Sequence, residues 1–388
     1  MHFPPPCLYL IYSIYFTGRH LVCFGTNRYS EIPLRLTQAY TTTMSPIKLE
    51  LEEQPQLLDI RQGQSNFDPV AEITRGLTSQ PLSIPSLLLW NDRGLKLFDR
   101  YTQIPSYYPF HSEIDVLRLY SASIGASMPA GGVLLELGCG AIHKTKLILA
   151  GLRKQQKPVH YFALDLSPES LVASVLELRR SFQDSPFITI TGLLGTYDDC
   201  ITWLSGTKSL REYHSMTVLW LGNSIANMDN PGEASVFLER FSTACERAQL
   251  ACLFVVSIDI CQKDAKVKEG YSGPEIRDWL LNSLETASLA LGYDSFSSAD
   301  WSDSTWMDNY NRTLHVCLAA NRDVVIPLPS PVNGNESVTI RKGQHVTMIR
   351  SGKWKEETVG DMCEQAGFRI QQRWKDGDGD YCVFLLGQ

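Results

Sequence analysis

The sequence has 388 residues, of which 44% are hydrophobic and 20% are charged, and its formal net charge is −7 at pH 7. This length and composition predict a folded globular chain with one large domain or two modest ones, and exclude a disordered or fibrous protein. The negative charge provides no field that would attract nucleic acid or an anionic membrane. The expected partners are therefore small molecules.

Cysteine and histidine usage bears on the compartment and on metal binding. The ten cysteines include no pair at C-x-x-C spacing, and most lie in apolar segments. This pattern predicts reduced, buried thiols in a cytoplasmic protein rather than disulfides or a zinc site. None of the eight histidines belongs to a cluster of metal-ligand type, so no metal is expected.

The first 43 residues differ in composition from the rest of the chain. The apolar run from Cys7 to Phe16 ends before Gly18, well short of the roughly 20 residues that a membrane-spanning helix needs. No stable membrane insertion is therefore expected, although a weak anchor is an alternative. The preferred interpretation is a disordered extension or a wrongly assigned start, with Met44 as the natural first residue.

The predicted elements begin with a short helix at 70–76, a proline-bounded break at 81–85 and a helix over 112–125. From residue 132, short and almost continuous apolar runs alternate with helical patterns, which is typical of strands covered on both faces in a parallel sheet. The strands are expected at 133–135, 161–164, 187–190, 218–221 and 250–256, with helices at 143–153, 168–182 and 231–247 between them.

The second half of the chain interrupts this alternation before returning to it. A helix at 274–291, an aromatic stretch at 301–310 and strands at 313–319 and 336–350 are too extensive for a loop. A helix at 357–366 and a hairpin of strands at 368–370 and 381–386 follow. The prediction is a doubly wound α/β fold with a smaller α+β substrate domain, divided into 1–43 (extension), 44–115 (N-terminal part of the substrate domain), 116–259 (cofactor-binding core), 260–355 (substrate-side insertion) and 356–388 (closing helix and hairpin).

The pentad Glu136-Leu137-Gly138-Cys139-Gly140 is the sharpest local signal, because it joins a predicted strand to a helix. Glycines at such a turn let the backbone approach a nucleotide closely. A dinucleotide fingerprint would need a third glycine at position 143, which is histidine, so the loop suits S-adenosylmethionine better than a pyrophosphate. A glycine-rich turn without a ligand is the other alternative.

Four further residues are candidates for binding cofactor or substrate, each with a purely structural alternative. Asp165 ends the second strand, where a carboxylate can accept hydrogen bonds from ribose hydroxyls, although it could instead cap the next helix. Asn227 follows the fourth strand, where it would meet a substrate, but loop polarity explains it nearly as well. Lys144 by itself suggests a surface charge, and Tyr107 a core residue.

Four segments in order resemble the histidine-specific-methyltransferase-like family, whose members include ergothioneine-pathway enzymes that trimethylate histidine and fungal 4-dimethylallyltryptophan N-methyltransferases of ergot alkaloid biosynthesis. The resemblance runs from about residue 75 to the C-terminus and implies a class I, Rossmann-like, S-adenosylmethionine-dependent N-methyltransferase. The segments that carry it are 94–99, 104–109, 136–145 and 221–227.

The resemblance also implies roles for particular residues. The cofactor would contact Glu136, Gly138, Gly140, Lys144 and Asp165, with Tyr197 near the adenine. The carboxylate and amino group of an amino-acid substrate would be held by Tyr107, Asn227 and Tyr271. No residue can be named as a general base for the reaction.

Histidine-using members carry a glutamate and a serine that hold the imidazole. Here Ser351 matches the serine, but Met348 or Ile349 stands in place of the glutamate. An apolar wall suits a prenylated indole better than an imidazole, and no second module follows the methyltransferase as it does in fungal ergothioneine enzymes. The favoured substrate is thus the α-amino group of 4-dimethylallyltryptophan. Histidine and a non-catalytic binding module are the alternatives, and a homodimer is left open.

Overall fold

A computed structural model describes residues 15–17, 20–22, 56–61, 67–329 and 336–388. Gln54–Gln388 form one compact unit, which carries every described element except β1 and β2. The expectation for residues 1–43 lies almost entirely outside the described residues. Of that range the structure describes only β1 (Tyr15–Thr17) and β2 (His20–Val22), which pair in antiparallel.

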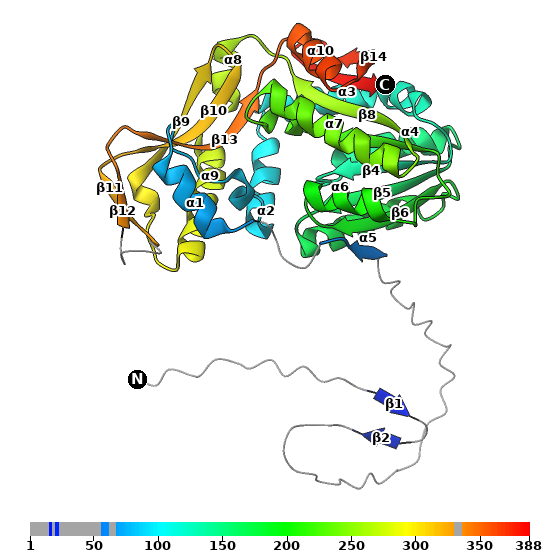
Figure 1. The fold of residues 1–388 in the computed structure, drawn as a ribbon, viewed down its shortest axis with the longest axis horizontal. Helices are drawn as coiled ribbons and strands as arrows, with labels where there is room; N and C mark the ends of the chain where they lie inside the picture. Colours follow the sequence, from blue (N-terminus) through cyan, green and yellow to red (C-terminus); the bar gives the residue numbers. More distant parts are fainter. Residues whose placement is uncertain (1–14, 18–19, 23–55, 62–66, 330–335) are drawn as a thin grey trace, which may run out of the picture. The chain divides into compact units, whose positions relative to one another are not determined.

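The centre of this unit is an eight-stranded sheet with the order β14-β15-β8-β7-β4-β5-β6-β3 (Figure 1). The strands from β3 to β8 pair in parallel, whereas β15 is antiparallel to both of its neighbours. The chain reverses direction across the sheet at β4, so the crevice beyond the carboxyl end of β4 is the expected ligand position. The strands are β3 (Leu57–Asp59), β4 (Gly132–Leu137), β5 (Val159–Asp165), β6 (Ile188–Leu194), β7 (Ser215–Trp220), β8 (Ala251–Asp259), β14 (Arg369–Lys375) and β15 (Tyr381–Gly387).

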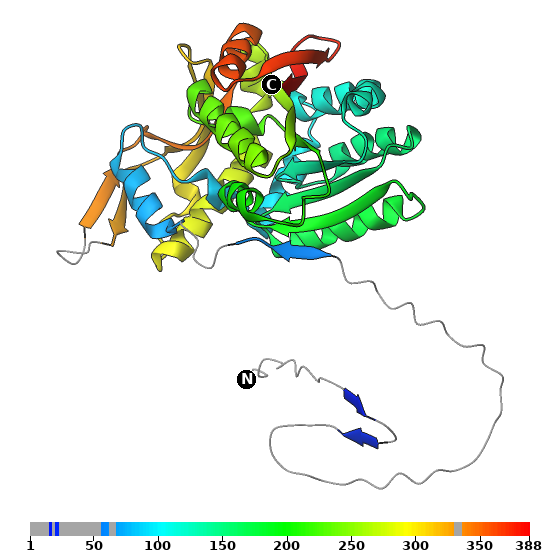
Figure 2. The ribbon, with the colours of Figure 1, turned by 45° about the vertical axis from the view of Figure 1, so that its right-hand side comes forward.

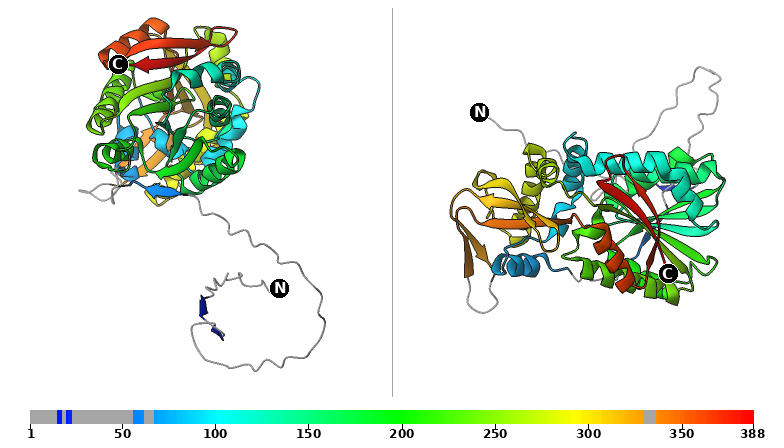
Figure 3. Two further views of the ribbon diagram at one scale, coloured as in Figure 1. Left: turned by 90° about the vertical axis from the view of Figure 1, so that its right-hand side faces the viewer. Right: turned by 90° about the horizontal axis from the view of Figure 1, so that it is seen from above.

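Helices cover both faces of this sheet, as Figure 3 shows from two sides. One apolar cluster joins the sheet to α3 (Tyr108–Ser127), α4 (His143–Lys154) and α5 (Pro168–Phe182). Another joins it to α6, α7 and α10 on the opposite face. This covering explains the nearly continuous apolar strands, and it confirms the predicted doubly wound class. The helices of the second face are α6 (Tyr197–Gly206), α7 (Pro231–Arg247) and α10 (Glu356–Gln365).

A smaller layer is built on a three-stranded antiparallel sheet with the order β13-β10-β9, and it lies at the left in Figure 1. A separate hairpin, β11–β12, extends from it, as Figure 2 shows. Its own apolar cluster holds the aromatic side chains that the sequence concentrates before residue 110. The elements are α1 (Pro69–Thr78), η1 (Ser86–Leu89), α2 (Asp92–Thr102), α8 (Asp264–Gly270), α9 (Pro274–Leu291), η3 (Ser298–Asp300), β9 (Trp301–Asp308), β10 (Thr313–Ala320), β11 (Val324–Leu328), β12 (Glu336–Ile340) and β13 (His345–Gly352).

Several elements differ from the sequence-based expectation. The single strand expected at 336–350 is wrong: a turn at 341–344 divides it into β12 and β13, which belong to different sheets. Gly343 adopts φ +81° in this turn, which breaks the strand. The elements β3, α2, α6, α8 and β11 were not expected, and β9 was expected only as an aromatic stretch. Of these, β3 pairs with β6, although its residues fall within the range 44–115 assigned to the substrate domain.

The structure leaves the remaining domain boundaries as predictions, since residues 54–388 are one compact unit. Among the helices of the described residues, none combines the length and the apolar character needed to cross a membrane. The eight described cysteines are free and buried, whereas Cys7 and Cys23 lie outside the described residues.

Candidate functional site

The loop after β4 makes a tight turn at the switch point of the sheet. Gly138 and Gly140 adopt φ values of +71° and +43°, in the left-handed region that favours glycine. The amides of Gly138 and Cys139 both donate to the carbonyl of Leu164, each at 3.0 Å, which fastens the loop to β5. The glycines therefore serve the backbone conformation first, and they leave the loop surface free of side chains.

Asp165 stands at the end of β5, as predicted, and its carboxylate holds the glycine loop. Oδ2 accepts from the amide of Gly140 at 3.0 Å, while Oδ1 accepts from the amides of Leu166 at 2.7 Å and Ser167 at 3.2 Å. Ser167 itself caps α5 by accepting from the amide of Ser170. The carboxylate is therefore fixed in orientation beside the loop, and the capping alternative applies to Ser167.

Glu136 is a buried carboxyl at the end of β4. Its Oε2 accepts from the hydroxyl of Thr145 at 2.7 Å and from that of Tyr161 at 2.5 Å. Its other oxygen forms no hydrogen bond with any residue in the described part of the chain, so one acceptor remains for a ligand. Burial raises the pKa of Glu136 to about 7, and the two hydroxyl donors oppose that rise.

Lys144 is not a solvated surface charge. Its Nζ lies 3.0 Å from Oε2 of Glu113, a carboxylate with a 1% exposed side chain. The other oxygen of Glu113 accepts from the amide of Gly222 at 2.8 Å and the hydroxyl of Ser257 at 2.6 Å. Glu113 thereby ties α4 to the ends of β7 and β8, and it brings the loops after β4 and β7 together.

Tyr197, the first residue of α6, lies against the same loop. A Cβ added to Gly138 would come within 3.2 Å of its hydroxyl. The ring packs against Trp220 and Phe237, at centroid distances of 5.7 and 5.8 Å. Burial raises the pKa of Tyr197 to about 12, so its hydroxyl stays protonated at neutral pH.

Three of the residues predicted to bind substrate come together where the small sheet meets the large one. Tyr107 precedes α3 and packs edge-on against Tyr271, with 5.4 Å between ring centroids. The hydroxyl of Tyr271 lies 3.1 Å from Oγ of Ser351 in β13. Burial raises the pKa of both tyrosines well above the usual value, so both remain neutral hydroxyls.

Four residues around this group were missed in the sequence. Lys353 and Asp259 form a salt bridge of 2.7 Å with both side chains fully buried. Asn223 donates to Ser351 at 3.0 Å, and Tyr108 donates to Asp259 at 2.6 Å. In the sequence, Asp259 at the end of an apolar run was a signal for a strand-end carboxylate, whereas nothing local distinguishes Lys353.

Asn227 and Met348 take no part in the hydrogen bonds that join Tyr271 and Ser351. Asn227 ends η2 (Ser224–Asn227) and is half-buried, and its amide makes no hydrogen bond to another described residue. Met348 and Ile349 are both buried in the apolar cluster that also holds Tyr107 and Tyr271. The register of β13 against β10 shifts at this point, which accounts for two neighbouring residues facing one cluster.

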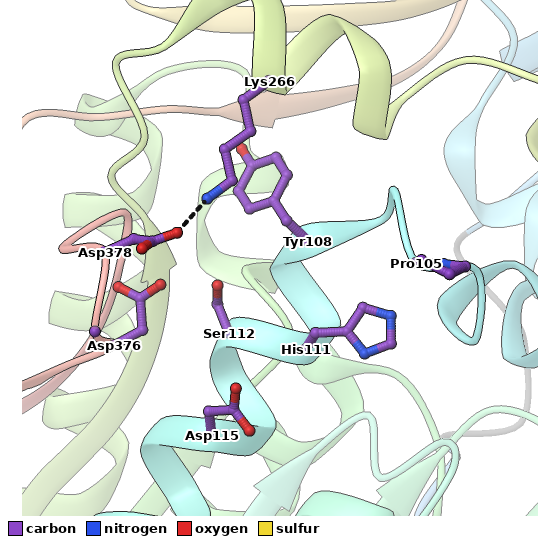
Figure 4. Close-up of a pocket in the computed structure, with 9 residues that line it drawn as sticks. Pro105, Tyr108, His111, Ser112, Asp115, Lys266, Asp376 and Asp378 are labelled. Carbon is purple, nitrogen blue, oxygen red and sulfur yellow. Dashed lines mark hydrogen bonds and ion pairs between the residues drawn. The ribbon is translucent and has the colours of Figure 1, made fainter.

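A surface hollow of about 460 Å³ is lined in part by Tyr108, whose hydroxyl donates to Asp259. Figure 4 shows Asp376 and Asp378 facing Ser112 and Asp115 across it, with Lys266 bonded to Asp378. None of the predicted site residues lines this hollow. Within the described ranges, no group of three or more His, Cys, Asp or Glu side chains could hold a metal ion.

The strand order and the glycine loop define a class I S-adenosylmethionine-dependent methyltransferase. Residues 70–388 match the family model described as "Histidine-specific methyltransferase, SAM-dependent", and the chain belongs to that family. The protein is accordingly an S-adenosylmethionine-dependent N-methyltransferase, as predicted.

Named relatives agree with this assignment. The N-methyltransferase benX of Aspergillus terreus is 38% identical over 348 residues, which cover 88% of this chain and 95% of the relative. Ergothioneine biosynthesis protein 1 of Neurospora crassa is 28% identical, over 86% of this chain and 36% of that protein. The 4-dimethylallyltryptophan N-methyltransferase easF of Trichophyton verrucosum is 27% identical, over 86% and 97%.

The residues at the loop fit S-adenosylmethionine. An added Cβ at Gly140 would meet no atom within 4 Å, so the backbone there borders open space. The free oxygen of Glu136 is an acceptor next to the loop, and Oδ2 of Asp165 is shared between the amide of Gly140 and the weak thiol donor of Cys139. Such acceptors suit the ribose hydroxyls and amino group of the cofactor. The contacts assigned to individual residues remain predictions.

Proposed function

We propose that the protein transfers a methyl group to the α-amino nitrogen of an aromatic amino acid, with 4-dimethylallyltryptophan as the specific substrate, in the cytoplasm. The proposal is supported by one observation: tyrosine hydroxyls and apolar side chains lie together in one buried cluster. Tyr107 and Tyr271 belong to the same buried cluster as Met348 and Ile349. Such a site suits a molecule with a polar amino-acid end and a large apolar ring.

The residues of this chain position the reactants more than they transform them. The bound cofactor supplies an electrophilic methyl group on a sulfonium, and attack by a neutral amine then needs alignment more than a strong base. Tyr107 and Tyr271 are protonated hydroxyls and suit the substrate carboxylate as hydrogen-bond donors. Asn227 has an amide without a partner among the described residues, and its carbonyl oxygen suits the substrate amine.

Histidine is the second candidate, because the chain is similar to an ergothioneine biosynthesis protein. The buried Met348 and Ile349 argue against it. Neither side chain can accept a hydrogen bond from an imidazole N–H, and a buried polar group without a partner is costly. Arg350, the next residue, is basic and forms an ion pair with Asp229, so it does not replace the missing glutamate.

The test is mass spectrometry of the products formed from S-adenosylmethionine and, in separate reactions, 4-dimethylallyltryptophan, tryptophan and histidine. The expected result is a gain of one methyl group on the prenylated amino acid alone. Trimethylated histidine would contradict the role given to Met348 and Ile349. The absence of any product, together with measurable cofactor binding, would favour a binding module without catalysis.

Two variants of one position separate these outcomes further. Ile349→Glu introduces the carboxylate that histidine-using members carry, while Ile349→Gln is the uncharged control of the same shape. Ile349→Glu is expected to lower kcat/KM for the prenylated substrate by about tenfold or more, since the apolar ring would remove water from the new carboxylate without pairing it, at a cost of at least about 1.4 kcal/mol. A smaller loss in the glutamine variant would assign the effect to charge.

A further inference from the structure

A buried ion pair stands directly behind the substrate hydroxyls. Lys353 follows β13 in the small sheet, and Asp259 ends β8 in the large sheet, with 2.7 Å between Nζ and Oδ2. Asp259 also accepts hydrogen bonds from the Tyr108 hydroxyl at 2.6 Å and from the Cys261 amide at 3.0 Å. A buried pair of this kind is weak evidence for stability, because desolvation offsets the attraction. Stability alone therefore does not explain an ion pair buried at this position.

The amide of Asn223 has a fixed orientation that limits what Ser351 can do. The backbone N–H of Asp259 donates to Oδ1 of Asn223 at 2.8 Å. Nδ2 of Asn223 must then face Ser351, to which it donates at 3.0 Å. Lys353 also donates to Ser351, at 2.9 Å. Since a hydroxyl oxygen accepts two hydrogen bonds, the Ser351 proton must itself be donated.

The same reasoning continues to Tyr271. Within the described part of the chain, the Ser351 hydroxyl has one remaining partner, the hydroxyl of Tyr271 at 3.1 Å. Tyr271 also accepts from Lys353 Nζ at 2.9 Å. Its oxygen is then filled by two donors, so its own proton points away from them. Tyr107 is a further neighbour of this hydroxyl, so the Tyr271 proton is available to Tyr107 or to a bound ligand. The Tyr271 oxygen can offer neither of them an acceptor.

We propose that Lys353, held by Asp259, is a positioning residue that makes the Tyr271 hydroxyl an obligatory hydrogen-bond donor, so that the site selects substrates with a carboxylate over the corresponding decarboxylated amines. The ammonium of Lys353 lies 4.3 Å from the Tyr271 ring centroid, and the carboxylate of Asp259 at 2.7 Å neutralises its charge. Its effect on a bound anion is therefore exerted through the hydrogen bonds that it donates. Removing the ammonium frees one acceptor on Ser351 and one on Tyr271, so the direction of their protons is no longer imposed. This inference rests on the proposed function for the identity of the substrate.

The decisive variant is the neutral pair Lys353→Met with Asp259→Asn. Lys353→Met alone would leave a buried, unpaired carboxylate and could fail to fold. The probes are 4-dimethylallyltryptophan and its decarboxylated amine. The expected result is a higher KM for the amino acid, a smaller change in kcat, unchanged affinity for S-adenosylhomocysteine, and a loss of about tenfold or more in the preference for the amino acid over the amine, equivalent to about 1.4 kcal/mol.

A matched control removes a different ion pair by the same chemistry. Lys375→Met with Glu356→Gln deletes a partly exposed pair of 2.6 Å beside β14. This control is expected to change neither KM nor the preference for the carboxylate. An unchanged preference in the variant of Lys353 and Asp259 would overturn the proposal.

A second experiment needs no substrate. Unfolding of the complete chain is compared for wild type, Ser351→Ala, the neutral pair at Lys353 and Asp259, and the combination of all three substitutions. If Lys353 bonds Ser351, the two losses of stability will be less than additive. Additive losses would overturn the inference. Less than additive losses of stability, together with no turnover of any tested amino acid, would contradict the proposed function but support the hydrogen-bond network.

Discussion

The buried carboxyl of Glu136 predicts a specific dependence of stability on pH. Burial raises its pKa to about 7, above the usual 4.5 that it has in the unfolded chain. The folded protein therefore holds one extra proton between these values, and the free energy of unfolding falls as pH rises through that window. For these two pKa values the loss is about 3 kcal/mol, and it is complete above about pH 7.

Glu136→Gln removes this titration while it keeps an oxygen for the hydroxyls of Thr145 and Tyr161. The stability of the variant relative to wild type is expected to rise by about 3 kcal/mol between pH 4.5 and pH 7.5. Urea unfolding without ligand, monitored by circular dichroism across this range, measures it. Glu177→Gln, at an exposed partner of Lys146, is the control and is expected to show no such rise. A difference for Glu136→Gln that stays constant with pH would refute the reasoning.

Three further substitutions test the site. Gly222→Ala is expected to lower methyl transfer, because φ is +76° and the new Cβ would lie 2.9 Å from Nζ of Lys144. The control Gly343→Ala has a similar φ in open space, and an unfolding assay should show only the loss of stability of about 1–2 kcal/mol that a left-handed backbone costs. Asn227→Ala is expected to raise KM and lower kcat with cofactor affinity unchanged, and calorimetry showing an equal loss of cofactor binding would refute its role. Asp165→Asn replaces one of the two acceptor oxygens by an NH2 group, so the amide of Gly140 or those of Leu166 and Ser167 lose their acceptor, and a titration with S-adenosylhomocysteine is expected to show at least about tenfold weaker binding.

The local pattern of apolar residues was sufficient to predict most strands of the large sheet. Continuous apolar runs predicted five of its parallel strands, because a strand covered on both faces has little room for polar side chains. The pentad ending at Gly140 and the carboxylate at Asp165 were recognisable since each stands at the end of such a run. By contrast, β3 has only three residues. Its pairing with β6, rather than any periodicity, makes it a strand.

The residues predicted from the resemblance were also brought together only in part. Tyr107, Tyr271 and Ser351 meet, while Asn227 stays apart from their hydrogen bonds. The sequence could not indicate that Lys144 is paired, because its partner Glu113 lies on another helix and looks like an ordinary helical glutamate. Side chains far apart in the chain become partners only through packing.

The sequence by itself determined the class of fold, the position of the glycine loop and the family, since these depend on short segments whose chemistry is local. The tertiary structure alone decided which polar groups face one another at the substrate site. Asp259 ends β8 of the large sheet and Lys353 follows β13 of the small sheet, and nothing in either segment indicates the other as its partner. Their burial as a pair follows from the packing of the small sheet against the end of β8, and hydrogen-bond saturation then fixes the direction of the Tyr271 proton.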